Sequence, residues 1–453
     1  MLLALIFLAL PPVGSDAETA AVAPKLEALS SFGSFMDRAA EKNGLFRRDS
    51  WREVIHPLVS VDFTRPETMI EVGIDPKGGG SFWTNGPLTV VCVELADQKR
   101  FEEIARAKLK TLGKDWSVKS SGLTVLGSKD AIDRVMAGYV IKGRLSCSAS
   151  VQGQSAEKPL TEVAKLMASG LGAKGFSAKG DLVIRSGPVL AGLKANGLTL
   201  EGDLRSAGLA MGKLSAGSSP YADAKPPGLA VLRLRQDPSE LAHLDRGLLS
   251  TLASSLSLPP EAVQAAAKAF SEHTTGNFIV LVSRVQVTQS LRTATGRFFA
   301  LRQAWVAEAK SAADAEELKK MLAATPGAIA DGDSFSLRTG VRAGVKGSNV
   351  WFANDTETLK TLLAAIGEKA GAQKHGLELE LDPKLLAKAL SQVPLLDAVS
   401  DPSLAGLLAA GSEMGPLLGV TQRLALTADG EPGAHSGHLI WSLAPGATPD
   451  AGK

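Results

Sequence analysis

The chain has 453 residues, of which 45% are apolar and 21% are charged. This composition is typical of a globular protein, and the length exceeds what one hydrophobic core normally serves. The 49 basic and 47 acidic residues leave a formal net charge of +2, and only two tyrosines are present. This charge balance argues against a nucleic-acid-binding protein, which needs a clustered excess of Lys and Arg. The scarcity of aromatic residues argues against a stacking platform for bases or sugars.

The first 17 residues are typical of a secretory signal peptide. Two prolines end the apolar run MLLALIFLAL, and Ser15 and Ala17 are small residues at the −3 and −1 positions of a cut before Glu18. The run is about half the ~20 residues that span a bilayer, which favours a leader over an anchor. No basic residue precedes it, which departs from the usual pattern. We therefore expect an exported, soluble protein, periplasmic or secreted, with no transmembrane span in the mature chain.

Residues 18–57 are expected to form an N-terminal helical segment. Apolar residues recur at helical spacing over 25–42, and a second short helix is expected over WREVIHPL. A first α+β domain is expected over 58–218. Its predicted elements are a helix at 67–72, a Gly- and Pro-rich turn, a strand at 88–95, a helix at 97–113, a strand, tight turn and helix over 123–138, a strand at 142–150, a helix at 160–171, and short strands at 180–187, 197–204 and 208–214.

The segment SAGSSPYADAKPPG, residues 215–228, is expected to be a linker, because it is rich in Gly, Pro and Ser. A second α+β domain is expected over 228–443, followed by a disordered tail over 444–453. Its predicted elements are a strand, Asp-Pro and helix at 229, a helix from 259, strands over 276–291 and 297–309, a helix at 314–325, a hairpin leading into a strand, turn and helix over 350–365, a second strand, Asp-Pro and helix at 376–390, and a C-terminal hairpin.

Two patterns recur along the chain. LTVLGSKDAIDRVMAG at 123–138 matches VWFANDTETLKTLLAA at 350–365 in its order of apolar, turn and capping residues, and the strand–Asp-Pro–helix pattern occurs at 229 and 377. A diverged duplication explains these recurrences, and a chance recurrence of common strand–helix pieces is the alternative. We therefore predict an α+β fold with two related halves of mostly antiparallel sheet and helices on one face.

Cys92 and Cys147 are the two cysteines of the chain, and both lie in strand-like runs. An even count in an oxidising compartment favours a disulfide, whereas two separate buried thiols are the structural alternative. The sequence alone leaves both alternatives open. Two cysteines without clustered histidines do not form a zinc site.

Residues 59–150 resemble a group of uncharacterised exported bacterial proteins found in myxobacteria and their relatives. The resemblance lies in VDFTRPETMIEVGIDPKGGGSFW, LTVVCVELADQKRFEEI and TVLGSKDAIDRVMAGYVIKGRLSCSAS, with the GIDP element at Gly73–Pro76 as its most distinctive part. It covers about a fifth of the chain. The resemblance implies export, and it implies no catalytic residue.

Motifs that could carry chemistry are all incomplete. PKGGGS lacks the Gly-Lys-Ser/Thr ending of a phosphate-binding loop, and SAEK at 155–158 lacks the companion motifs of serine acyl-transfer enzymes. His435 and His438 have no third metal ligand at suitable spacing, and the other histidines, His56, His243, His273 and His375, are scattered. We therefore predict no catalytic, cofactor-binding or metal-binding residue and no cofactor.

The function that the sequence favours is that of an exported, non-enzymatic protein of the cell envelope, acting by binding or as a scaffold. The alternative is a periplasmic carrier of an apolar, lipid-like ligand. The expected partner is thus an unknown protein or an apolar ligand in the envelope, and not a nucleic acid. A carrier requires an apolar cavity of at least about 300 Å3, whereas a protein-binding role requires an exposed apolar patch or an open sheet edge.

Overall fold

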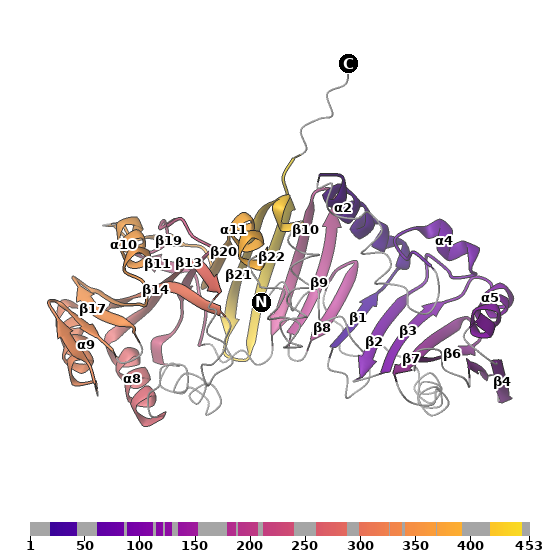
Figure 1. Ribbon diagram of the computed structural model, residues 1–453, viewed down its shortest axis with the longest axis horizontal. Coiled ribbons are helices and arrows are strands. Elements are labelled where there is room, and N and C mark those ends of the chain that lie inside the picture. The colour runs from indigo at the N-terminus through magenta and orange to yellow at the C-terminus, as the bar shows by residue number, and fades with distance from the viewer. Residues whose placement is uncertain are drawn as a thin grey trace, which may run out of the picture. The chain divides into compact units, whose positions relative to one another are not determined.

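The computed structural model describes residues 19–42, 61–85, 88–111, 115–120, 123–128, 135–152, 179–186, 189–206, 212–239, 260–287, 299–325, 327–337, 340–367, 369–391 and 417–445. It is a mixed α+β structure in which antiparallel strands predominate and several helices pack on the sheet (Figure 1). The chain divides into two compact units. We call residues 1–205 with 445–453 unit 1, and residues 206–444 unit 2. Among the described residues, no helix combines the length and apolar character needed to cross a membrane.

The strands of unit 1 pair in the order β4–β5–β6–β7–β3–β2–β1–β8–β9–β10. Their bounds are β1 Thr19–Ala23, β2 Gly80–Asn85, β3 Leu88–Glu94, β4 Asp115–Ser120, β5 Leu123–Ser128, β6 Val135–Lys142, β7 Leu145–Gln152, β8 Leu182–Ser186, β9 Val189–Asn196 and β10 Thr199–Ser206. The N-terminal strand thus lies in the interior of this order, between β2 and β8.

The helices of unit 1 are η1 (Leu26–Ala28), α2 (Leu29–Lys42), α4 (Pro66–Glu71) and α5 (Gln98–Thr111). One core cluster joins η1, α4 and α5 to the sheet, and Phe101 of α5 packs edge-on against Tyr139 of β6 at 5.7 Å between ring centroids. Figure 1 shows α2, α4 and α5 along one side of the strands. Burial raises the pKa of the Tyr139 hydroxyl, because the charged form would lose its hydration.

The GIDP element is a turn that connects α4 to the sheet. Gly73 adopts a left-handed conformation with φ of 83°, and its carbonyl accepts hydrogen bonds from the backbone of Ala96 and Asp97. Ile74 is 1% exposed in the core. The Asp75 carboxylate accepts from Lys77 N and pairs with Arg144 at 2.7 Å. These contacts give the most distinctive residues of the sequence a structural role.

Gly73→Ala should lower the free energy of unfolding of unit 1 by about 2 kcal/mol or more, because the new Cβ would lie 2.4 Å from the Asp97 carbonyl oxygen in a left-handed conformation. The matched control is Gly143→Ala, where φ is 56° but nothing lies within 4 Å of the added Cβ. Chemical denaturation of both variants measures the difference. Equal losses would show that the contact with Asp97 contributes nothing.

The strands of unit 2 pair in the order β15–β16–β17–β18–β14–β13–β12–β20–β21–β22, and β11 pairs with β19 separately. Their bounds are β11 Gly217–Ser219, β12 Ala230–Arg235, β13 Thr274–Val287, β14 Phe299–Ala309, β15 Ile329–Asp331, β16 Ser334–Ser336, β17 Arg342–Lys346, β18 Asn349–Ala353, β19 Gly371–Gln373, β20 Leu377–Leu381, β21 Thr421–Glu431 and β22 Ala434–Leu443. The helices are α8 Pro260–His273, α9 Ala312–Ala324, α10 Thr356–Ala365 and α11 Pro383–Ser391.

Helices of unit 2 pack on both faces of its sheet, which corrects the expectation of one covered face. Trp351 belongs to the core cluster beneath α10, whereas its neighbour Val350 belongs to the cluster beneath α8 and α9. Consecutive residues of a strand point to opposite faces, so α10 and α9 lie on opposite sides. Long apolar runs in the sequence, such as FIVLV in β13, are consistent with burial on both faces.

Several segments differ from the sequence-based expectation. Residues 18–57 are not wholly helical, because Thr19–Ala23 is a strand of the sheet. The helix expected to end at Gly138 is wrong there, because 135–142 is strand β6, in which aromatic and β-branched residues continue past the glycine. Residues 215–228 are not a linker but part of unit 2, and their Tyr221 and Ala224 are buried against the sheet. The helices expected at 51–58 and 160–171 lie outside the described residues.

Candidate functional site

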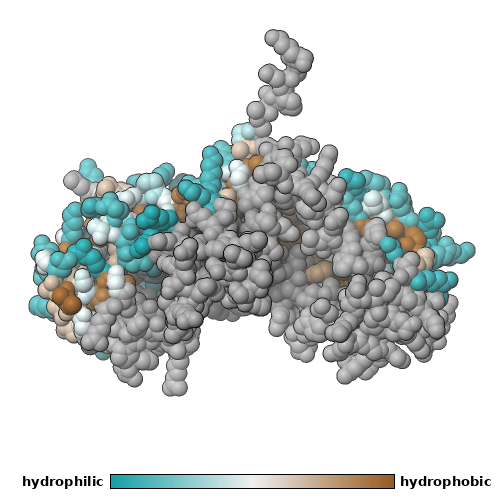
Figure 2. Space-filling view, in the orientation of Figure 1, coloured by the Kyte–Doolittle hydropathy of each residue, from teal (hydrophilic) through white to brown (hydrophobic). Residues whose placement is uncertain are grey.

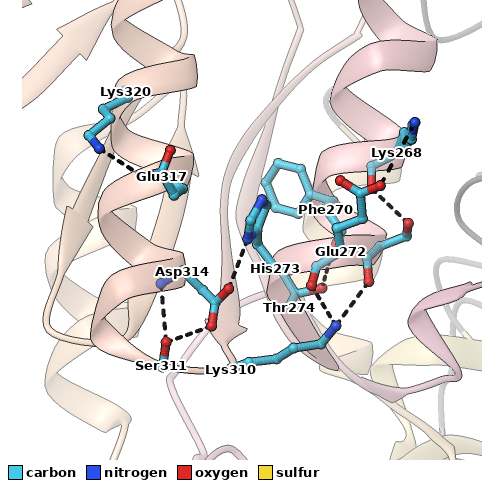
Figure 3. Close-up of polar contacts among 11 residues, drawn as sticks. Lys268, Phe270, Glu272, His273, Thr274, Lys310, Ser311, Asp314, Glu317 and Lys320 are labelled. Atoms are coloured by element: carbon cyan, nitrogen blue, oxygen red, sulfur yellow. Dashed lines mark hydrogen bonds and ion pairs between the residues drawn. The ribbon is translucent and has the colours of Figure 1, made fainter.

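Polar side chains gather at the junction of α8 and α9, as Figure 3 shows. His273 is the last residue of α8, and Ser311 caps the N-terminus of α9. His273 Nδ1 donates to Asp314 Oδ1 at 2.8 Å, and Ser311 Oγ donates to Asp314 Oδ2 at 2.6 Å (Figure 3). Lys310 Nζ donates to the backbone oxygen of Glu272 at 2.5 Å. The junction thus joins the end of one helix to the start of the next.

An aspartate that orients a histidine supplies two of the three members of a nucleophilic triad, so the position of the third member decides whether this group could act as one. A triad requires a hydroxyl directed at the imidazole nitrogen that the aspartate leaves free. Ser311 instead donates to Asp314, and its Oγ accepts from Asp314 N at 3.2 Å, as a helix cap does. The charges also suit the helix dipoles, with the Lys310 ammonium at the C-terminus of α8 and the acid Asp314 in the first turn of α9. This group is therefore a structural clamp.

Hydrogen bonds from His273 and then Ser311 lower the pKa of Asp314. Because the folded pKa lies below the unfolded one, the resulting stability is present above about pH 4 and is lost as pH falls through the folded pKa. His273→Ala should therefore raise the pKa of Asp314 and reduce the loss of stability in acid, with a smaller rise for Ser311→Ala. Carboxyl 13C NMR titration measures the pKa, and Lys320→Ala is the control. An unchanged pKa in His273→Ala would contradict the assignment.

A second aspartate–histidine pair lies elsewhere in unit 2. His375 Nδ1 donates to Asp429 Oδ2 at 2.7 Å, and Gly376 N donates to Asp429 Oδ1 at 2.7 Å. Glu378 accepts from the backbone nitrogens of Lys374 and His375. Here too the carboxylates fix a backbone segment, the one between β19 and β20. The two pairs span 41 and 54 residues of sequence, so no local spacing could reveal them.

The start of α10 carries a chain of hydroxyl groups. Asp355 caps the helix through Thr358 N at 3.0 Å and accepts from Thr358 Oγ1 at 2.7 Å, and Thr358 Oγ1 lies 2.6 Å from Ser283 Oγ. These bonds lower the pKa of Asp355. A neighbouring pocket of about 50 Å3 is lined by Gly340, Arg342, Trp351, Ala353, Asn354, Asp355, Thr356 and Leu359. Its volume is far below the roughly 300 Å3 that a cavity for a lipid-like ligand requires.

The HSGH motif cannot bind one metal ion through both imidazoles. His435 and His438 lie on strand β22, and residues three apart on a strand point to opposite faces. His435 is 3% exposed, and its Nε2 donates to the Gly212 carbonyl at 3.0 Å. In the part of the chain that the structure describes, no three His, Cys, Asp or Glu side chains are arranged to hold a metal ion. His56, His243 and SAEK lie outside the described residues.

The glycines of PKGGGS allow close packing rather than ligand binding. Leu26 N donates to Gly78 O at 2.9 Å, and Glu27 N donates to Pro76 O at 2.7 Å, so η1 rests directly on this turn. A Cβ on Gly80 would lie 2.4 Å from Leu26 Cδ2. The segment therefore packs directly against η1 and continues into β2.

Cys92 and Cys147 are joined by a disulfide. They lie directly opposite each other on β3 and β7, with an S–S distance of 2.14 Å. The two residues are 3% and 0% exposed. The sequence left open a disulfide or two separate buried thiols, and the structure contains the disulfide. A buried disulfide is compatible with an oxidising location outside the cytoplasm.

Comparisons with known proteins assign no family and no function to the chain. No protein-family description matches the chain, and no curated protein or solved structure is significantly similar to it.

Proposed function

We propose that the chain is an exported protein of the cell envelope that binds a protein partner, or acts as a scaffold, without catalysis of its own. Two observations support export: the leader-like N-terminus and the buried Cys92–Cys147 disulfide. The polar groups described above, including both aspartate–histidine pairs, hold helix ends and backbone segments in place. They therefore give an enzymatic reading no support.

Strand β15 is the observation that carries the binding proposal. Among the described strands it pairs only with β16, and all three of its residues are exposed. Ile329 is 69% exposed, and Met321 of the adjacent α9 is 37% exposed. Figure 2 shows that described residues on the face in view are mainly hydrophilic, with small apolar areas. An exposed edge strand beside apolar side chains can pair with an extended segment of another protein.

A photo-crosslinking amino acid at Ala330, introduced in cells, tests this role. We expect a discrete crosslinked protein that is lost when Ile329→Asp places a charge on the edge. The matched control places the same probe at Ile70, an isoleucine on α4 that is 61% exposed. The binding role is contradicted if the Ala330 probe gives no product beyond that of Ile70, or if Ile329→Asp leaves the product unchanged.

Native mass spectrometry of protein purified from the envelope tests the carrier alternative. A bare chain mass is expected under the binding proposal. A small apolar mass that co-purifies with the chain, and that organic extraction removes, would instead favour the carrier.

We also propose that the two units are related by duplication. When strands are matched in chain order, β1 to β10 correspond to β12, β13, β14, β15, β16, β17, β18, β20, β21 and β22, and the sheet orders given above then coincide. The correspondence differs from the one the recurrent patterns indicated, since β5 at 123–128 matches β16, and β18 at 349–353 matches β7. The two Asp-Pro segments follow β12 and β20 of the same unit, so they are not copies of each other across the units.

A further inference from the structure

Strand β1 is the link that joins two parts of the unit 1 sheet. Its residues pair with β2 on one side, where Ala20 lies opposite Trp83, and with β8 on the other, where Ala20 lies opposite Arg185. Among the described pairings of unit 1, no other strand connects β2 to β8. Without β1 the order separates into β4–β5–β6–β7–β3–β2 and β8–β9–β10, each with an unpaired edge.

Both faces of β1 are buried. Ala20 and Ala21 are 0% and 6% exposed and point to opposite faces, because they are consecutive in a strand. Ala23 belongs to the core cluster that also contains Leu26 and Val93. A small side chain suits this position, since Ala20 lies directly opposite the large, buried Trp83 in the ladder. The backbone of a docked β1 is therefore inaccessible to solvent and to a peptidase.

The same strand begins at Thr19, two residues after Ala17, the predicted end of the leader. The expected cut lies between Ala17 and Glu18, and pairing with β8 begins at Thr19. A processing peptidase must hold residues on both sides of the bond in an extended, accessible conformation. Cleavage of a paired, buried segment requires local unfolding. Removal of the leader and docking of Thr19 and Ala20 therefore exclude each other.

We propose that β1 is the keystone of unit 1, the strand that joins the two parts of its sheet, and that insertion of β1 blocks removal of the leader, so that processing has to precede closure of the sheet. The timing rests on the proposed export and on cleavage before Glu18, whereas the keystone role rests on the pairing alone. Unit 2 needs no such step. Its strand in the same position, β12, follows residues 212–229, which belong to the same unit and pack against its sheet through Tyr221 and Ala224.

The first experiment measures hydrogen exchange of the mature chain, Glu18–Lys453, and of its Ala20→Asp variant, which buries a charge beside Trp83. We expect exchange in peptides covering β1, β2 and β8 to be at least about tenfold faster in the variant, with β12 and β13 unchanged. The matched control is Lys25→Asp, which places the same charge on an exposed residue just after β1. Faster exchange confined to β1, with β2 and β8 still protected, overturns the keystone role.

The second experiment measures cleavage of the purified folded precursor by a leader peptidase in detergent. Docked β1 should protect the bond, so Ala20→Asp should be cut at least about tenfold faster than the wild type and than Lys25→Asp. Equal cleavage rates for the wild type and Ala20→Asp would overturn the proposal that the leader is removed before β1 inserts. Mass spectrometry that identifies the first residue of the protein from the envelope distinguishes equal cleavage rates from a failure of the export proposal. A chain that does not begin at Glu18 overturns the export cut, while the exchange experiment still decides the keystone role.

Discussion

Replacing Cys92 and Cys147 together with alanine should lower the free energy of unfolding of unit 1 by about 4 kcal/mol. The disulfide closes a loop with a sequence separation of 55 residues, and removing it restores chain entropy to the unfolded state. The effect should be confined to unit 1, because both cysteines lie on its strands β3 and β7. Denaturant unfolding followed by hydrogen exchange of peptides from each unit measures this loss.

The wild-type chain supplies the control for the disulfide. After unfolding in reductant and refolding with the thiols kept reduced, it should show the same loss as the alanine pair. Cys92→Ala alone should behave likewise, because Cys147 then has no partner. A loss below about 1 kcal/mol in all three samples would mean that strand pairing alone fixes this part of the sheet.

Replacing Arg233 with alanine should lower the free energy of unfolding of unit 2 by about 3 kcal/mol. The Arg233 side chain is 2% exposed on β12, and its guanidinium lies 3.7 Å from both Glu378 and Glu380 of β20. Its Nε and Nη2 also donate to the Ala224 carbonyl at 3.0 and 2.6 Å. Removing the cation leaves the two carboxylates without a counter-charge and the carbonyl without its donors.

The charge and the packing contributions of Arg233 can be separated. Arg233→Met keeps much of the side-chain volume, and combining it with Glu378→Gln and Glu380→Gln also removes the stranded charges. We expect the triple variant to recover most of the stability lost in Arg233→Ala, because a buried ion pair is often replaceable by neutral groups. Thermal unfolding of the variants checks this. A triple variant as unstable as Arg233→Ala would show that Ala224 is the important partner.

Elements with a strong local signal were predictable from the sequence. The Ser311 and Asp355 caps mark the starts of α9 and α10, and Asp382 before a proline marks α11. Alternating residues mark β20, and a Pro-Gly turn joins β21 to β22. In these places local propensity and tertiary packing agree, so the pattern is sufficient.

Elements that depend on distant partners were not predictable. Strand β2 begins in a glycine-rich run that reads as a turn, but it pairs with β1 and β3, and Gly80 leaves room for Leu26 beside it. The predicted N-terminal helical segment contains β1, whose alanines carry no strand preference of their own. The two aspartate–histidine pairs join residues that no spacing relates.

The sequence by itself determined the class of the protein: α+β, with the positions of most helices and strands, and with two cysteines able to pair. These properties follow from periodicity, capping and composition, which act over a few residues. Only the tertiary structure decided the strand order, the placement of β1 between β2 and β8, the joining of Cys92 to Cys147, and the distribution of helices over both faces of unit 2. The physical reason is that strand pairing and burial are long-range choices, made by backbone hydrogen bonds and apolar contacts between segments far apart in the chain.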